Sequence, residues 1–389
     1  MATGKNAAGR LIPCVLAVLA IHAVCFKAGA DFHAFHQAGV RLLDGEPLYR
    51  LDDDIFFWYL PVVAQWMAPW SLLPTRLAHA LWVFGSAAAL SKFFANASRE
   101  AGLEGHWRAS LLAIALVLPF VVQELSLGQC NALLLLAMSQ SESWRINRTA
   151  LSGFLCAIAC IVKPAYLVFV LLAVAWHEWR RLWWLSFTLV LVTASGAISF
   201  GATYPSQLVA WRELMVATVP PAICAPDNQS LFAIFCTYVI RPNTGSFGIA
   251  VTAFALVLFG LAALTVRRIR ALDEGGARFL ASGLAFYATA LLSPTGWLTN
   301  LVSTAPLMFF LIAHLRVNRS SGTRVLAMLA LALVAAADLV NYHTVGQLNF
   351  QRVLHYRHYG TAALLAVILL CLSVWTVQLA RPRRTFAHC

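Results

Sequence analysis

Long uninterrupted apolar runs limit this chain more than any other feature. Runs such as LLAIALVLPFVV and LLAVILLCLSVW are apolar on every side, and polar residues gather in the joints between runs. A helix that crosses ~30 Å of hydrocarbon needs about 20 such residues, whereas a membrane β-barrel shows segments of about ten residues with alternating polarity. Only 11% of the residues are charged, far below the roughly one quarter of a soluble domain. The sequence therefore predicts an all-α, polytopic membrane protein.

The apolar runs predict about twelve transmembrane helices. The first, residues 11–30, is interpreted as a retained span with a cytoplasmic N-terminus, with a signal cleaved near Ala28 and Ala30 as the alternative. The runs 56–72 and 129–141 are short for a crossing, so ten to thirteen spans are compatible with the sequence. The remaining predicted spans are 76–95, 109–123, 150–173, 181–200, 247–266, 278–292, 297–315, 323–340 and 358–379.

The net charge of +12 comes from small basic clusters between the apolar runs. This distribution is typical of the cytoplasmic loops of membrane proteins and not of a nucleic-acid-binding surface. Anionic lipid is the expected partner of these clusters, and nucleic acid is not expected. The sequence predicts a multi-pass protein of a cell membrane, in particular a bacterial inner membrane. The clusters are WRR at 179–181, RRIR at 267–270, RVNRSSGTR at 316–324 and RPRR at 381–384.

Residues 1–389 are expected to form a single membrane domain with its chemistry in the outer segments. These are the first outer loop 31–55, the segment 201–246, the turn 293–297 and the last outer loop 341–359. No phosphate-binding P-loop occurs, which argues against ATP-driven transport. The nine cysteines show no metal-ligand spacing, so neither zinc nor a disulfide framework is indicated, although Cys224 and Cys236 have the option of meeting outside the membrane.

Asp31 follows the first predicted span directly. At the C-terminal end of that helix the dipole is negative, so a carboxylate there is expected to be more basic than usual. Asp31 is then either a general base at the lip of a cavity or a solvated loop acid. Asp52, Asp53 and Asp54 form a run of like charge, which predicts a solvated cap before the next helix.

Lys163 interrupts the apolar run CAIACIVKPAYLV. A lysine in mid-span costs about 2.5–3.5 kcal/mol on insertion scales, so Lys163 is expected to face an anionic partner such as phosphate. The alternative is snorkelling, helped by a kink at Pro164. A polar break, QELSLGQCN, contains Glu124, Gln129 and Asn131. Such breaks persist at membrane depth where they line a cavity or pack inside protein.

Two outer segments carry further polar groups. The amides and hydroxyl of Asn228, Gln229 and Ser230 suit sugar hydroxyls, or else Asn228 or Ser230 caps the helix that follows. The last outer loop lacks HxH or HExxH spacing, so its cations are expected to contact phosphate or lipid headgroups and not a metal. These cations are His343, Arg352, His355, Arg357 and His358.

Six segments in one order resemble glycosyltransferase family 87, whose members are membrane mannosyltransferases that use a polyprenyl-phosphate sugar. The resemblance implies a GT-C type fold with its active site at the outer, periplasmic face and a lipid or glycan acceptor. Because the leaving group is already a lipid phosphate, no cofactor is needed and a divalent metal is optional. The six segments, spread over about 30–300, are Asp31 with LLDGEPLY, then YLP, GQCNALL, IVKP, NQSL and LLSPTGW.

Carried over residue by residue, the resemblance implies Asp31 as the catalytic base and a structural GxxLY turn at Gly45 and Tyr49. Substrate contacts are implied for Tyr49, Gln129, Asn131, Asn228, Gln229, Ser230, Trp297 and Asn300. Two departures concern cations. The histidine pair that commonly follows SPxxW is replaced by Leu298, Thr299 and Asn300, and the arginine expected soon after NQSL is found only at Arg241. Binding of the donor phosphate therefore falls to Lys163, Arg241 and His355.

The resulting hypothesis is an inverting transfer of a hexose, mannose by the resemblance, with Asp31 accepting the proton of the acceptor hydroxyl. It requires Asp31 and Lys163 to share one pocket outside the cytoplasm. The alternatives are a flippase or transporter of lipid-linked saccharides, which should show related halves, a ligase or polymerase of surface polysaccharide, and an inactive homologue.

Overall fold

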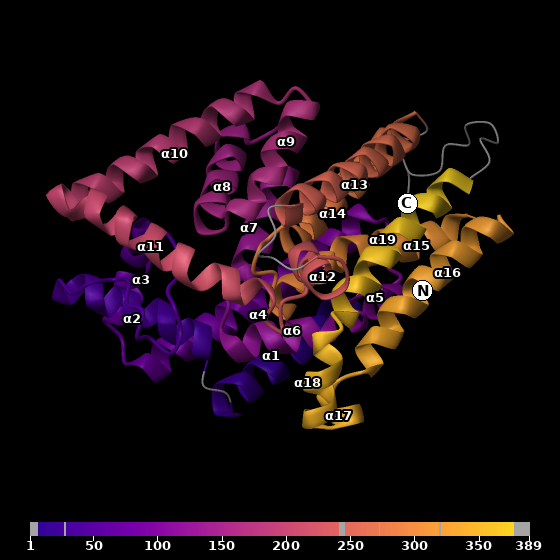
Figure 1. The fold of residues 1–389 in the computed structure, drawn as a ribbon. Coiled ribbons are helices and arrows are strands. Elements are labelled where there is room, and N and C mark those ends of the chain that lie inside the picture. Colours follow the sequence, from indigo (N-terminus) through magenta and orange to yellow (C-terminus); the bar gives the residue numbers. More distant parts are fainter. Residues whose placement is uncertain (1–6, 27–28, 241–245, 272, 319, 377–389) are drawn as a thin grey trace. The chain divides into compact units, whose positions relative to one another are not determined.

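A computed structural model describes residues 7–26, 29–240, 246–271, 273–318 and 320–376. Every regular element in these ranges is helical, which confirms the all-α prediction (Figure 1). The chain divides into two compact units that interleave along the sequence. The N-terminal unit comprises Pro13–Phe93 and Val122–Pro220, and the C-terminal unit comprises Met1–Ile12, Phe94–Val121 and Pro221–Cys389.

Unit boundaries fall inside four helices: α1 (Ala7–Phe26), α4 (Thr75–Glu100), α6 (Leu118–Leu127) and α11 (Tyr204–Ile223). Within the N-terminal unit α2 packs on α3, and α8 packs on α7 and α10. Its remaining helices are α2 (Ala30–Asp44), α3 (Pro61–Ser71), α7 (Asn131–Trp144), α8 (Thr149–Val162), α9 (Val168–Ala175) and α10 (Trp179–Phe200), with 3₁₀ turns η1 (Pro164–Leu167) and η2 (Gly201–Thr203).

Local sequence explains where several of these helices begin and end. Gly45 ends α2 in the left-handed region, at φ 70°, and its N–H reaches back to the carbonyls of Arg41 and Leu42. Pro61 begins α3, where its missing N–H costs nothing. At Lys163 the backbone is extended, because the residue before a proline disfavours the helical region, and the predicted span 150–173 is therefore split into α8, η1 and α9.

The acidic run 52–54 does not cap α3, contrary to the sequence-based prediction, since that helix begins only at Pro61. Instead Asp53 accepts two hydrogen bonds from the guanidinium of Arg41, at 2.6 and 2.5 Å. Arg41 lies on α2 and is 5% exposed, so its charge needs a partner inside the protein. One Asp53 oxygen faces each guanidinium nitrogen, and the pair holds the segment 45–53 back against α2.

The C-terminal unit is organised around η3 (Leu298–Thr304) and α15 (Ala305–Val317). The apolar window of this stretch is 94% buried, so its side chains form the core of the unit. α16 and α19 run side by side, and α13 packs on α14 (Figure 1). The other helices are α5 (Trp107–Ala115), α12 (Leu231–Tyr238), α13 (Ser246–Arg270), α14 (Glu274–Leu291), α16 (Ser321–Leu339), α17 (Tyr342–Val345), α18 (Gln347–His355) and α19 (His358–Thr376).

Six stretches of helix in the described part of the chain are long and apolar enough to cross a membrane. They rise to eight if each of two bent pairs, α1 with α2 and α5 with α6, makes one crossing. The window of α13 is only 11% buried, as expected of a helix that faces lipid. Several predicted spans are shorter than a bilayer here: 56–72 contains α3, whose 11 residues extend about 17 Å. The predicted number of twelve is not confirmed.

Candidate active site

Asp31 lies in the first turn of α2 and not at the C-terminal end of the first span. The helix dipole is therefore not the cause of the expected higher basicity of Asp31, because a helix N-terminus favours a carboxylate. α2 carries Asp31, Arg41 and Asp44 and has 15 residues, so it is too charged and too short to cross a bilayer alone. Gly29 precedes it in the left-handed conformation, and a Cβ at Gly29 would overlap the ring of His79.

Gln129 holds the Asp31 carboxylate. Its Nε2 donates to Asp31 Oδ2 at 2.7 Å. Burial raises the pKa of the Asp31 carboxyl above its ordinary value, while the bond from Gln129 and the positive charge of Lys163 partly oppose that rise. The loop that carries Gln129 comes close to α2 because Gly128 has φ +67° and no Cβ; a Cβ there would stand 2.7 Å from Cβ of Phe32.

A second chain of hydrogen bonds includes Lys163. The Glu124 side chain is fully buried, and its Oε1 accepts from the N–H of Ala132 at 2.8 Å. Its Oε2 accepts from Asn131 Nδ2, also at 2.8 Å. The Oδ1 of Asn131 then accepts from Lys163 Nζ at 2.6 Å. In the sequence, Glu124 stands out only as part of a polar break, with no role of its own.

These residues form one polar centre within the N-terminal unit, which we name the acid–lysine centre: Asp31, Glu124, Gln129, Asn131 and Lys163. Asp31 and Lys163 interact electrostatically. A carboxylate held beside an ammonium provides a proton acceptor and a cation for a developing phosphate charge. A pocket shared by the two residues stays a prediction.

The motif Asn228–Gln229–Ser230 is buried in the C-terminal unit and bonded to its backbone. Asn228 Nδ2 donates to the carbonyls of Ala222, Ile223 and Pro294, at 3.2, 3.1 and 2.7 Å. Asn228 Oδ1 accepts from the N–H of Ser230. The Ser230 hydroxyl is the N-cap of α12, which confirms the capping alternative.

Gln229 joins the motif to the last part of the chain. Its Nε2 donates to the carbonyls of Pro226 and Leu354, and its Oε1 accepts from the N–H of Gly360 at 3.1 Å. Through these contacts the motif stabilises the loop before α12 and holds it against the segment 354–360. Contact with a substrate stays a prediction for all three residues of the motif.

A disulfide joins Cys224 to Cys236 and encloses this motif. Cys224 and Cys236 thus form the pair that the sequence left open, although no disulfide framework was expected. Arg357 clamps the same segment: Nη1 and Nη2 donate to the carbonyls of Ala225 and Cys224 at 2.6 and 2.7 Å, and Nε donates to Thr237. Arg357 is 1% exposed, so the expectation that it contacts a phosphate or headgroup is wrong.

The other predicted site residues make the following contacts. Tyr49 donates to the carbonyl of Tyr59 at 2.7 Å, which fits the predicted structural turn. Trp297 forms an isolated β-bridge with Asn228, and buried Asn300 donates to the carbonyl of Thr295. His355 is exposed at the end of α18. The prediction for Arg241 lies outside the described residues.

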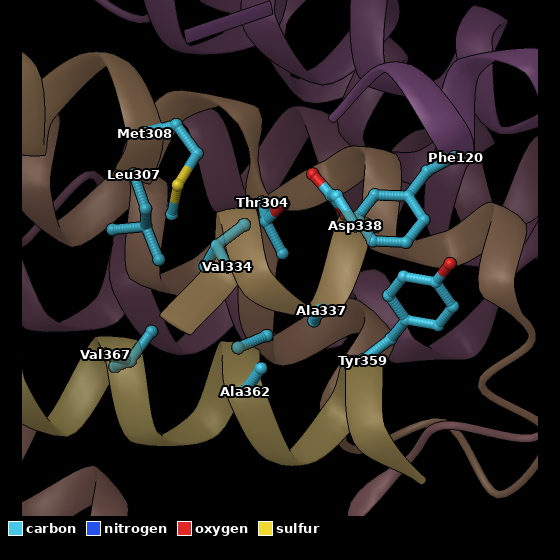
Figure 2. Close-up of a pocket in the computed structure, with 11 residues that line it drawn as sticks. Phe120, Thr304, Leu307, Met308, Val334, Ala337, Asp338, Tyr359, Ala362 and Val367 are labelled. Carbon is cyan, nitrogen blue, oxygen red and sulfur yellow. The ribbon is translucent and has the colours of Figure 1, made fainter. Parts of the chain in front are cut away.

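A small cavity in the C-terminal unit is lined mostly by apolar side chains (Figure 2). At one end Asp338 lies beside Phe120 and Tyr359, and both carboxylate oxygens of Asp338 are buried without a hydrogen-bond partner in the described residues. The volume that the centre of a water molecule can occupy in the cavity is about 10 Å³, enough for about one water. A hexose therefore does not fit. Elsewhere in the described ranges, no three His, Cys, Asp or Glu side chains converge as a metal site requires.

Comparison with known proteins identifies the family. The family model of glycosyltransferase family 87 matches residues 57–294, more than half of the chain. This range includes Gln129, Asn131 and Lys163, whereas Asp31 precedes it. Neither a curated protein nor a solved structure matches the chain. The match confirms the resemblance seen in the motifs, and a membrane glycosyltransferase requires a donor and an acceptor substrate. The chain belongs to glycosyltransferase family 87.

Proposed function

We propose that the protein transfers a hexose, in the first instance mannose, from a polyprenyl-phosphate donor to a hydroxyl of a lipid-linked or glycan acceptor. The observation that carries this proposal is the acid–lysine centre, in which the carboxylate of Asp31 is held by Gln129 and interacts with the charge of Lys163. Family membership supplies the reaction class. The two charges supply the roles that a sugar transfer from a lipid phosphate needs.

In the proposed step, the acceptor oxygen attacks the anomeric carbon from the face opposite the phosphate. The acceptor proton passes to Asp31 as the new C–O bond forms. The bond between the anomeric carbon and the phosphate oxygen breaks, and its electron pair leaves with the phosphate, whose charge Lys163 stabilises. The anomeric configuration is inverted. The phosphate stays attached to its lipid, so the donor needs no nucleotide site.

The proposal includes a GT-C type fold of about twelve spans with the acid–lysine centre facing the exterior or periplasm of a cell membrane. The short apolar helices Thr149–Val162 and Pro164–Ala175 are candidates for crossings beyond the six long ones. The disulfide Cys224–Cys236 supports an extracytoplasmic position for its own segment, because disulfides persist in oxidising compartments. Labelling of single introduced cysteines with an impermeant maleimide tests this topology. Asp54→Cys should be labelled in intact cells, and labelling only after the membrane is permeabilised would contradict the proposal.

The function is tested by transfer of radiolabelled mannose from polyprenyl-phosphate mannose in membranes of a strain that lacks the gene and expresses each variant. Asp31→Asn keeps the size of the side chain and removes the base, so the rate should fall ~10²–10⁴-fold. Asp54→Asn is the matched control, since Asp54 is an exposed acid of the same outer loop. A wild-type rate for Asp31→Asn would exclude the base role, and no transfer from any polyprenyl-phosphate hexose by the wild type would exclude the donor class.

A further inference from the structure

Glu124 is a buried acid to which the proposed reaction gives no role. It lies on α6, is 0% exposed, and accepts hydrogen bonds from two neutral amide groups. Burying a carboxylate is costly, and an apolar residue or glutamine is usually tolerated where only packing or capping is needed. One of its bonds does cap a helix, because Ala132 is in the first turn of α7 and its N–H has no partner within that helix. That bond needs only one acceptor oxygen, so it does not explain why position 124 holds an acid and not a glutamine.

The second oxygen of Glu124 fixes the orientation of the Asn131 amide. An asparagine amide has a donor end and an acceptor end, and the two can exchange by a half turn. A carboxylate only accepts, so it selects the orientation in which Nδ2 of Asn131 faces Glu124. The acceptor Oδ1 must then point away, and it receives the bond from Lys163 Nζ at 2.6 Å. The reversed amide would set its oxygen against a carboxylate and its NH₂ group against an ammonium.

A glutamine at position 124 would not make this selection, since its own amide both donates and accepts. The pair of amides would then have two arrangements of similar energy, and one of them points the Asn131 NH₂ group at Lys163. A charged acceptor removes that ambiguity. The Glu124 carboxylate also interacts electrostatically with Lys163 and with Asp31, so it belongs to the same charge system.

We propose that Glu124 is a positioning residue which, through Asn131, fixes the place of the Lys163 ammonium for the donor phosphate. This inference rests on the proposed function, because it takes Lys163 as the donor-phosphate cation. Glu124 touches no reacting atom in this scheme. Since Lys163 also stabilises the phosphate as it leaves, the effect should appear both in the binding of the polyprenyl-phosphate donor and in the rate of the chemical step.

The first test is Glu124→Gln, assayed with polyprenyl-phosphate mannose as the probe. The KM for the donor should rise about tenfold, the lower end of what a hydrogen bond to a charged group contributes, and kcat should fall as well. Gln123→Ala is the matched control, since Gln123 is the exposed neighbour of Glu124 on α6. An unchanged donor KM in folded Glu124→Gln would overturn the inference.

A double-mutant cycle separates positioning from a merely structural role. If Glu124 acts through Lys163, then Glu124→Gln should change the donor KM by no more than about twofold once Lys163→Met is present. A structural role would make the two effects additive. The exchange Glu124→Gln with Asn131→Asp should restore the donor KM, because the new carboxylate at position 131 accepts from both Lys163 and the amide introduced at position 124, while the oxygen of that amide still accepts from Ala132.

Should Glu124→Gln fail to fold, Asn131→Ala carries the same test, because it removes the link to Lys163 and leaves the cap on Ala132 in place. Its effect on donor KM should likewise vanish in the Lys163→Met background, and additivity would overturn the inference. These outcomes differ from failure of the proposed function. That failure appears as absent transfer by the wild type or as full activity of Asp31→Asn, whereas the inference fails in a wild type that transfers normally.

Discussion

Gln129 donates a 2.7 Å hydrogen bond to the Asp31 carboxylate from a loop 98 residues further along the chain. An amide donor stabilises the ionised form of an acid, and the same loop places Asn131 against Lys163. One short segment, the loop 128–130 with the first residue of α7, thus holds both the proposed base and the proposed phosphate cation. A substitution at Gln129 should therefore affect Asp31, and a substitution at Asn131 should affect Lys163, because each removes a different hydrogen bond.

The first prediction concerns pH. A general base must be ionised, and burial raises the pKa of Asp31, so transfer should decline as the pH falls through a value above that of an exposed aspartate. Gln129→Leu removes a bond that lowers this pKa, so the pKa should rise further and the acidic limb of kcat/KM should move to higher pH. Rates measured across pH 4–9, relative to wild type, check the direction. A limb that stays in place or moves to lower pH would contradict the assignment of Asp31.

The second prediction tests the close approach of Gly128 to α2. Gly128→Ala introduces both a left-handed alanine, at about 1–2 kcal/mol, and a Cβ only 2.7 Å from Cβ of Phe32. It should lower the melting temperature and also reduce transfer, since Gln129 is displaced from Asp31. Gly45→Ala is the matched control: its φ is +70°, and nothing lies within 4 Å of the added Cβ. Equal losses for the two variants, measured by thermal unfolding in detergent, would show that packing against Phe32 is unimportant.

Hydropathy was enough to predict the helical membrane fold, because apolar runs of this length have few alternatives in lipid. It was not enough to predict the boundaries. Lys163 and Pro164 split one apolar run into three pieces, and the stretch 109–123 divides into α5 and α6 with a bend of 61°. A sliding average of hydropathy responds to composition and not to backbone geometry, so such breaks do not register in it.

Motif order brought out most members of the acid–lysine centre but not the contacts that define it. The pairing of Arg41 with Asp53 depends on how a loop closes, which no local pattern encodes; for the same reason the sequence offered the Cys224–Cys236 disulfide only as an option. The acidic run at 52–54 was interpreted as a helix cap because like charges in sequence usually face solvent. The sequence offered one signal that Arg41 is buried: the residues at 34, 35 and 38 on the same helix are apolar. The structure shows that these three residues are buried.

The third prediction follows from that buried pair. Asp53→Asn leaves the 5% exposed guanidinium of Arg41 without its counter-charge, which should destabilise the protein by about 3–5 kcal/mol. The double variant Arg41→Met with Asp53→Leu removes both charges and should recover much of that loss. As a control, the exposed pair Arg50–Glu46 should matter by less than about 1 kcal/mol when Glu46→Gln is made. Thermal unfolding of the purified variants in one detergent compares them, and a loss for Asp53→Asn no larger than the control would refute the prediction.

The last prediction concerns the disulfide-closed segment 224–236 of the C-terminal unit. Cys224 and Cys236 are 12 residues apart, and closing a loop of that size stabilises the folded state by about 3 kcal/mol. The double variant Cys224→Ser with Cys236→Ser should therefore lower the melting temperature, as should reduction of the wild type with dithiothreitol. Cys14→Ser is the control, because Cys14 is an exposed free thiol. Arg357→Met should act in the same direction, since it removes the arginine donor from the carbonyls of Cys224 and Ala225 and leaves Ala225 with only the N–H of Asn228. Mass spectrometry after alkylation with and without reductant counts the thiols directly; alkylation of Cys224 and Cys236 in the unreduced, unfolded protein would show that the bond does not form.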